Sequence, residues 1–184
     1  MSFPTFEQIQ VGDALPPLTL DPVDRTTLAL FAGASNDHNA IHIDIDYARR
    51  AGMPDVFAHG MLSMAWLGRL LTLWVDQRQL RHFAVRFVGI THLGHRITCT
   101  GQVVEKYEAE GERRVKVELR TANQYGETKI LGDAVVLPAV ADSDAICDPA
   151  EEGRAPAERP WSAPFDGEVT YRVPSLSLPV PARN

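Results

Sequence analysis

The sequence has little cysteine and no segment suited to export or to a membrane. Its two cysteines, Cys99 and Cys147, show no metal-binding spacing, and we expect both to be free thiols. The N-terminus lacks the basic and apolar regions of a secretory signal. The longest apolar stretch, residues 61–75, contains Arg69 and is too short to cross a bilayer. These absences predict a cytoplasmic protein without a membrane partner.

Positive charge is also scarce. The 184 residues include 18 Lys and Arg against 24 Asp and Glu, which gives a formal net charge of −6. No short window is rich in Lys or Arg, so the sequence offers no surface suited to following nucleic-acid phosphates. We therefore expect no nucleic-acid partner.

Several common catalytic and nucleotide-binding motifs are missing. The sequence contains no Gly-rich phosphate loop, no G-x-S-x-G nucleophile elbow, no H-E-x-x-H zinc motif and no C-x-x-C pair. The composition is otherwise that of a globular protein, with 45% hydrophobic and 23% charged residues. The length suits one domain with an appendage.

Three helices are predicted in the first half of the chain. Asp24 is suited to cap a helix over residues 24–34, and Asp44 is suited to cap a shorter helix over residues 44–51. Residues 60–75 are apolar nearly all round, and a helix without a polar face is usually buried. We expect this third helix to lie in the core.

The second half of the chain has the pattern of strands. Apolar residues recur at every second position in three segments, 83–87, 97–100 and 115–120, and a final, mainly apolar run covers residues 130–137; turn-forming residues separate the segments. Short links of this kind favour antiparallel hairpins between consecutive strands. The predicted fold class is α+β, with an antiparallel sheet wrapped around one buried helix.

The chain changes character after Leu137. Eight of the 13 prolines lie in residues 138–184, together with several acidic residues. Each proline removes a ladder donor, so this segment is not expected to add central strands. We predict a domain over residues 1–137 and an extended arm over residues 138–184 that docks through its aromatic residues.

A polar cluster between the predicted helices carries the strongest candidates for chemistry. Asp37 and His42 are five residues apart, so they meet only if the chain curls. The turn-forming residues around them permit such a curl. A carboxylate and an imidazole that share one water form a general acid–base pair. The alternative interpretation is a turn-capping aspartate and a hydrogen-bonded, partly buried histidine.

Gly60 follows His59 where the third helix begins. The first N–H groups of a helix have no partner inside the helix, and a glycine there lets a ligand carbonyl come close. This arrangement is typical of an oxyanion hole. The alternative interpretation is a glycine that allows close packing.

A metal site is the competing interpretation of the polar cluster, because His38, His42, Asp44 and Asp46 are close in sequence. Two histidines four residues apart converge only on a helix, and the turn-forming residues argue against a helix here. Asp44 is better explained as a helix cap. We therefore predict no metal ligands.

The two motifs together resemble a known family. Residues 36–42 (Asn-Asp-His-Asn-Ala-Ile-His) and the later His-Gly-Met of residues 59–61 resemble the signature G-D-x-N-P-[ILV]-H … H-G-M. This is the signature of the MaoC-like (R)-specific enoyl-CoA hydratases and acyl dehydratases. The resemblance covers roughly residues 5–137 and implies a hot-dog fold, which matches the predicted helix wrapped by a sheet.

The resemblance also implies roles for four residues. Asp37 and His42 correspond to the catalytic pair, Asn39 helps to hold the water and the loop, and the backbone N–H of Gly60 corresponds to the donor to the thioester carbonyl. The sequence departs from the family pattern at two positions of the loop backbone, with Asn36 in place of Gly and Ala40 in place of Pro.

The reaction implied by the resemblance is reversible addition of water to a trans-2-enoyl thioester of CoA or acyl carrier protein, giving a (3R)-hydroxyacyl thioester. No cofactor is implied, and the implied assembly is a homodimer or one chain of a hetero-oligomer. Two alternatives remain. A hot-dog thioesterase is disfavoured because residues 58–75 contain no Asp or Glu. A non-catalytic acyl-CoA-binding subunit is disfavoured because both Asp37 and His42 are present.

Overall fold

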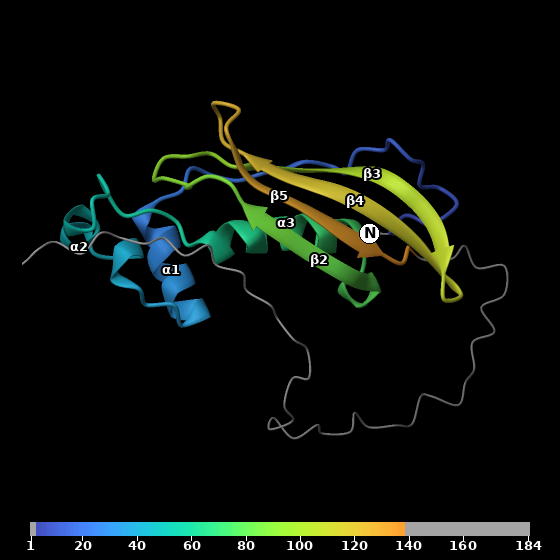
Figure 1. Cartoon of the computed structure of the whole chain (residues 1–184), viewed down its shortest axis with the longest axis horizontal. Coiled ribbons are helices and arrows are strands. Elements are labelled where there is room, and N and C mark those ends of the chain that lie inside the picture. Colours follow the sequence, from blue (N-terminus) through green and yellow to red (C-terminus); the bar gives the residue numbers. More distant parts are fainter. Residues whose placement is uncertain (1–2, 139–184) are drawn as a thin grey trace, which may run out of the picture. The chain divides into compact units, whose positions relative to one another are not determined.

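The computed structural model describes residues 3–138, so residues 139–184 of the predicted arm lie outside the described residues. Five strands and a few helices follow one another along this part of the chain (Figure 1). In chain order they are β1 (Leu18–Thr19), α1 (Arg25–Ser35), the 3₁₀ helix η1 (Ala40–His42), α2 (Ile45–Arg50), α3 (Gly60–Trp74), the 3₁₀ helix η2 (Gln77–Gln79), β2 (Leu80–Phe87), β3 (Thr98–Ala109), β4 (Glu112–Ala122) and β5 (Thr128–Val136).

The strands form one antiparallel sheet in the order β1-β3-β4-β5-β2. The hairpin between β3 and β4 turns at Glu110 and Gly111, which both have positive φ (54° and 76°), and such a pair matches the twist of a tight hairpin. The predicted hairpins from β3 to β4 and from β4 to β5 are confirmed.

The predicted hairpin between the first two long strands is wrong. β2 pairs with β5, at the opposite end of the sheet from β3. The connecting residues 88–97 do not make a tight turn, because a bridge from Phe57 to His92 holds part of them beside the chain that leads into α3. The connection therefore carries the chain from one side of the sheet to the other.

The main apolar core lies between the sheet and one side of α3. Leu67, Leu70 and Leu71 of α3 pack with buried side chains of β3, β4 and β5, and Figure 1 shows the sheet lying over this helix. The prediction that α3 is buried holds for this side only. Met61 and Leu73 are 40% and 56% exposed, and Ala65 is exposed as well, so the apolar pattern all round α3 does not reflect burial all round.

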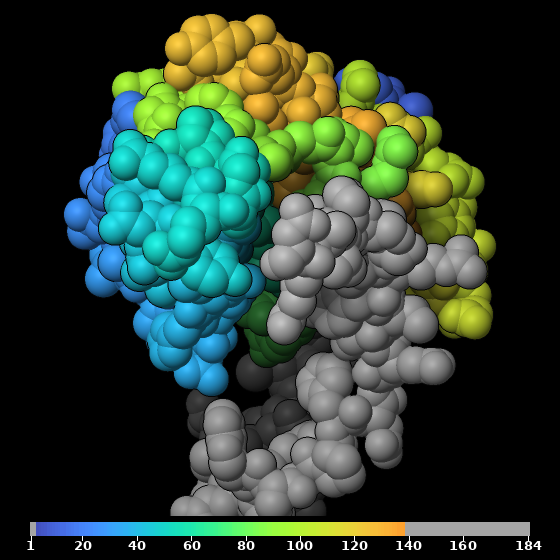
Figure 2. Space-filling view, turned by 60° about the vertical axis from the view of Figure 1, so that its left-hand side comes forward, coloured from blue at the N-terminus to red at the C-terminus, as the bar shows by residue number. Residues whose placement is uncertain are grey.

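A second, smaller apolar cluster lies beneath α1, α2 and the N-terminal turn of α3. Its buried residues are Val23, Leu28, Ala48, Val56, Ala58 and Leu62. Asp24 and Asp44 cap α1 and α2 through their carboxylates, as predicted. In Figure 2 this part of the chain is the blue and cyan block beside the strands drawn in green to orange.

The observed architecture confirms the predicted α+β fold, in which an antiparallel sheet curls around one long helix. Within residues 3–138, no helix combines the length and the apolar character needed to cross a membrane. Cys99 of β3 is fully buried against the core, and burial raises the pKa of its thiol to about 12.

Candidate active site

The loop between α1 and η1 brings a carboxylate and an imidazole to the same place. Asn36 ends α1 in the left-handed region (φ 58°), which reverses the chain. The N–H of Asn39 then donates to Oδ1 of Asp37 (3.2 Å), and the Asn39 side chain accepts from the N–H of Ile41 and caps η1. These bonds produce the curl that the spacing of Asp37 and His42 requires.

The tautomer of His42 is fixed by the backbone. Its Nδ1 lies 2.8 Å from the carbonyl oxygen of Phe57, and because a carbonyl only accepts, Nδ1 carries the proton. The Phe57 ring also meets the imidazole edge-on (4.9 Å between centroids). Burial lowers the pKa of His42 below its ordinary value of 6.5, whereas the hydrogen bond to the Phe57 carbonyl and, to a smaller extent, nearby Asp37 oppose this shift. His42 therefore keeps a free lone pair on Nε2 near neutral pH.

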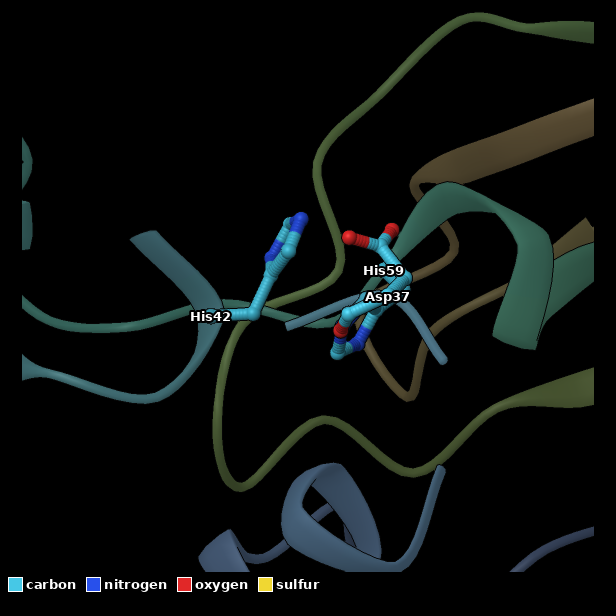
Figure 3. Close-up of side chains that lie close together, drawn as sticks. All are labelled: Asp37, His42 and His59. Carbon is cyan, nitrogen blue, oxygen red and sulfur yellow. The ribbon is translucent and has the colours of Figure 1, made fainter. Parts of the chain in front are cut away.

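Asp37 and His42 face each other without touching. A carboxylate oxygen of Asp37 and an imidazole nitrogen of His42 lie within 4.8 Å of each other, and His59 offers a nitrogen in the same space. The two residues form neither a direct hydrogen bond nor an ion pair within 4.0 Å among the described contacts. Figure 3 shows the Asp37 carboxylate turned toward the His42 ring. The carboxylate is exposed, whereas the imidazole is half-buried.

His59 is a member of this group that sequence reasoning did not assign. It is 1% exposed, its Nε2 lies 3.0 Å from the backbone carbonyl oxygen of Asp37, and its ring stacks on that of His42. The sequence marked His59 only as the neighbour of Gly60. Two signals pointed to it, its place in the His-Gly-Met motif and its position before the first helical residue of α3, but neither predicts the contact with Asp37, which spans 22 residues.

Gly60 is the first residue of α3 and lies at the surface. The residue before it, His59, makes no side-chain cap to the helix, and no described acceptor binds the N–H of Gly60 or Met61. A Cβ at Gly60 would lie 3.2 Å from Cε1 of the Phe87 ring, which is tighter than ordinary packing. Gly60 therefore offers an unpaired N–H, and it also makes room for Phe87.

Two pockets adjoin this site. One, of about 470 Å³, begins at Asp37 and runs along the exposed side of α3; its lining residues are Phe31, Ser35, Asp37, Met61, Met64, Ala65, Gly68 and Phe83. The other, of about 340 Å³, lies on the other side of the α3 N-terminus and includes Gly60, Ser63, Phe87 and Thr91. Both are lined mainly by apolar atoms, so both suit an apolar chain more than a charged ligand.

The structure does not assemble the set of residues that the metal interpretation required. Asp44 caps α2, accepting from the N–H groups of Asp46 and Tyr47. The group that does converge is Asp37, His42 and His59, but the two imidazole rings lie face to face, 4.0 Å apart with planes tilted by 32°. Their in-plane lone pairs run side by side and do not point at one ion about 2 Å from each nitrogen. We assign no metal ligands to these residues.

Comparison with known proteins decides the family. The family model described as the MaoC like domain matches residues 10–124, which is more than half of the chain. The chain belongs to the MaoC-like dehydratase family. Both motifs that suggested this resemblance, residues 36–42 and 59–61, lie inside the matched segment.

MaoC-like relatives include free-standing proteins and parts of much larger ones. The chain is 26% identical over 140 residues to the (R)-specific enoyl-CoA hydratase of Rhodospirillum rubrum, which covers 72% of this chain and 90% of that protein. It is 30% identical over 113 residues to the fatty acid synthase subunit beta of Aspergillus oryzae, covering 59% of this chain. The chain spans only 5% of the length of that synthase subunit.

The fold agrees with solved MaoC-like structures. The unliganded R-hydratase PhaJ1 from Pseudomonas aeruginosa superposes with a TM-score of 0.66 at 26% identity, covering 74% of this chain and 86% of that one. This likeness confirms the predicted hot-dog fold.

The two departures from the MaoC-like signature suit the local backbone. Asn36 replaces Gly at a position with φ 58°, and Asn is among the few other residues that adopt this conformation readily. Ala40 replaces Pro at the first position of η1, where Pro is favoured but not required. Both substitutions therefore leave the path of the loop intact.

Proposed function

We propose that this MaoC-like chain is a hydratase that adds water reversibly to a trans-2-enoyl thioester, most simply of CoA, to give a (3R)-hydroxyacyl thioester. The observation that carries the proposal is the spacing of Asp37 and His42 beside the N-terminus of α3. Two hydrogen bonds of ordinary length to one water span about 4.5 Å. This span fits between a carboxylate oxygen of Asp37 and a ring nitrogen of His42, which are no more than 4.8 Å apart. The two side chains thus have the spacing of a pair that holds a water between them.

In this mechanism His42 is the base. Its Nδ1–H is held by the carbonyl of Phe57, so Nε2 is free to take a proton from the water as the water oxygen bonds to C3. The electrons of the C2=C3 double bond move toward C2 and the thioester oxygen. A proton from the Asp37–His42 pair then completes the product at C2, so that one water is consumed and no group is lost.

Gly60 is the proposed donor to the thioester oxygen. Charge develops on this oxygen during the attack, and the unpaired N–H at the start of α3 would stabilise it. The adjacent pocket of about 470 Å³ is the proposed site for the acyl chain, because it begins at Asp37 and is lined by apolar side chains of α1, α3 and β2.

The proposed assembly is a homodimer that pairs through β2. This strand is at one edge of the sheet, and no strand among residues 3–138 pairs with its outer side. An open edge of eight residues invites pairing with a second strand, and a two-fold axis lets two copies satisfy each other. Size-exclusion chromatography with light scattering tests this: a monomer contradicts the dimer, and a stable complex only with another chain would favour a hetero-oligomer.

The activity is tested with crotonyl-CoA and a set of longer enoyl thioesters on CoA and on acyl carrier protein. We expect loss of the conjugated thioester absorbance and formation of the (3R) product, read with a stereospecific dehydrogenase. Release of free CoA from the saturated thioester would instead identify a thioesterase. Binding of acyl-CoA without turnover by the purified chain would identify a binding subunit.

A further inference from the structure

His59 connects the two halves of the site. Its Nε2 lies 3.0 Å from the carbonyl oxygen of Asp37, which is 22 residues earlier in the chain. The other side-chain bonds of the Asp37 loop are local, from Asp37 N–H to Ser35 Oγ and from Asn39 N–H to Asp37 Oδ1. Among the described contacts, the His59 bond is therefore the one that ties residues 36–39 to a distant part of the chain.

The same bond fixes where the His59 proton lies. Because a carbonyl only accepts, Nε2 is the donor and Nδ1 is left with a lone pair. Nδ1 is buried and has no partner in the described part of the protein.

The faces of the His59 ring are occupied as well. The centroid of the His42 ring lies 4.0 Å away with the two planes tilted by 32°, and that of the Phe31 ring lies 5.1 Å away at a tilt of 59°. The His42 ring is held at its edge by Phe57 and at Nδ1 by the Phe57 carbonyl. Because the buried His59 ring packs against it, the imidazole of His42 is kept from rotating toward the core.

We propose that His59 is a positioning residue that sets the distance between the acid and the base of this site. Its Nε2–H holds the backbone of Asp37, and its ring face holds the plane of His42. Because His59 directly precedes Gly60, it also holds the Asp37 and His42 side chains at a fixed position relative to the first N–H groups of α3. His59 could have capped α3, but its side chain bonds to Asp37 instead and leaves those N–H groups unpaired.

The two contacts are separable by substitution. His59→Phe keeps a flat ring against His42 and removes the donor. His59→Gln keeps an N–H donor near the position of Nε2 and removes the ring. His59→Ala removes both. Tyr125→Ala is the control for loss of an aromatic ring, because Tyr125 is 73% exposed in the turn between β4 and β5 and lines neither pocket beside the site.

This inference rests on the proposed hydratase function for its kinetic readout. We expect His59→Ala to lower kcat for crotonyl-CoA by about 10²-fold, since a shift of about 1 Å in a reacting group costs that much. KM should stay within about threefold because His59 does not itself line the acyl pocket. His59→Phe and His59→Gln should each recover part of the loss, and Tyr125→Ala should match the wild type.

A second readout needs no turnover. The pKa of His42 is lowered chiefly by the burial of its own ring and also by the electrostatic influence of His59, and His59→Ala uncovers that ring and removes that influence. NMR titration should therefore show the pKa of His42 rising toward its ordinary value in His59→Ala and staying low in His59→Phe. Circular dichroism and melting temperature show whether each variant is folded.

The outcomes separate the two hypotheses. An inactive wild-type chain contradicts the hydratase function, and the NMR titration then decides the role of His59 alone. An active wild type with unchanged kcat and unchanged His42 pKa in folded His59→Ala overturns the positioning role. Equal losses in all three variants, in step with their melting temperatures, also overturn it, because they indicate packing only. Partial recovery by Phe and Gln supports it.

Discussion

The cluster between the sheet and α3 and the cluster beneath the site are held in different ways. The first joins α3 to several strands whose backbones are already bonded in ladders, so its apolar side chains pack on a rigid frame. The second is smaller and joins short helices and loops, and single polar contacts from Asn39, His59 and the Phe57 carbonyl fix its geometry. The comparison teaches that the residues that form the main core are largely separate from those proposed to carry the chemistry.

The largest expected effect tests the site alone. Asp37→Asn and His42→Ala should each lower kcat for crotonyl-CoA by about 10²–10⁴-fold, because each removes one group of the proposed acid–base pair. Asp37→Asn keeps the size of an exposed side chain, so its melting temperature should stay close to that of the wild type. Steady-state kinetics and thermal unfolding measure the two quantities. Wild-type rates in both variants would show that this pair does not carry the reaction.

The next effect tests whether the two clusters are separable. Leu71→Ala in the main core and Leu28→Ala beneath the site should each cost about 2–5 kcal/mol of unfolding free energy, since both side chains are fully buried. Only Leu28→Ala should also lower kcat, because it loosens the packing under Asp37 and His42. Urea unfolding gives the free energies, and kinetics well below the transition gives the rates. Equal effects of both variants on kcat would show that the clusters act as one.

A smaller effect is expected at Gly60. Gly60→Val should lower kcat/KM by roughly 10–10²-fold, because its branched side chain obstructs the approach to an N–H donor of the kind worth that much or more. Gly60→Ala is the graded control, since a single Cβ meets the partly exposed Phe87 ring at 3.2 Å and that ring can move. A loss of folding in step with activity, already visible for Ala, would mean that Gly60 serves packing alone.

The smallest expected effect concerns pH. Burial lowers the pKa of His42, so its neutral, base-competent form persists below pH 6.5. The hydration rate should therefore fall as the pH drops through this lowered pKa, and the acid limb of kcat/KM should lie below 6.5. A rate profile from pH 5 to 8, with circular dichroism at each pH, tests the sign. An acid limb above 6.5 would contradict the environment assigned to His42.

Local patterns predicted the elements better than their connections. Asp24 and Asp44 marked the helix starts correctly because capping involves residues only a few positions apart. The pairing of β2 with β5 was missed because it depends on how residues 88–97 cross the sheet, which no local pattern records. The strand β1 was missed as well, since two residues show no alternation.

The site residues show the same contrast between local and long-range contacts. The curl that joins Asp37 to His42 was predictable, because Asn36 and Asn39 are turn formers within the loop itself. His59 was not assigned, because its bond to the Asp37 carbonyl exists only once α3 has packed beside the loop. Sequence reasoning thus finds groups joined by local turns, and tertiary contacts supply the residues that hold them.

Because Cys99 is buried, the reactivity of its thiol can report when the sheet opens locally. A thiol reacts as the thiolate, and a thiol that is fully enclosed with a pKa of about 12 offers almost none to a reagent in solution. In a Cys147→Ser variant, Cys99 is the sole thiol. The rate at which a thiol reagent labels Cys99 then measures how often β3 separates from the core. This rate reports the local opening of the sheet.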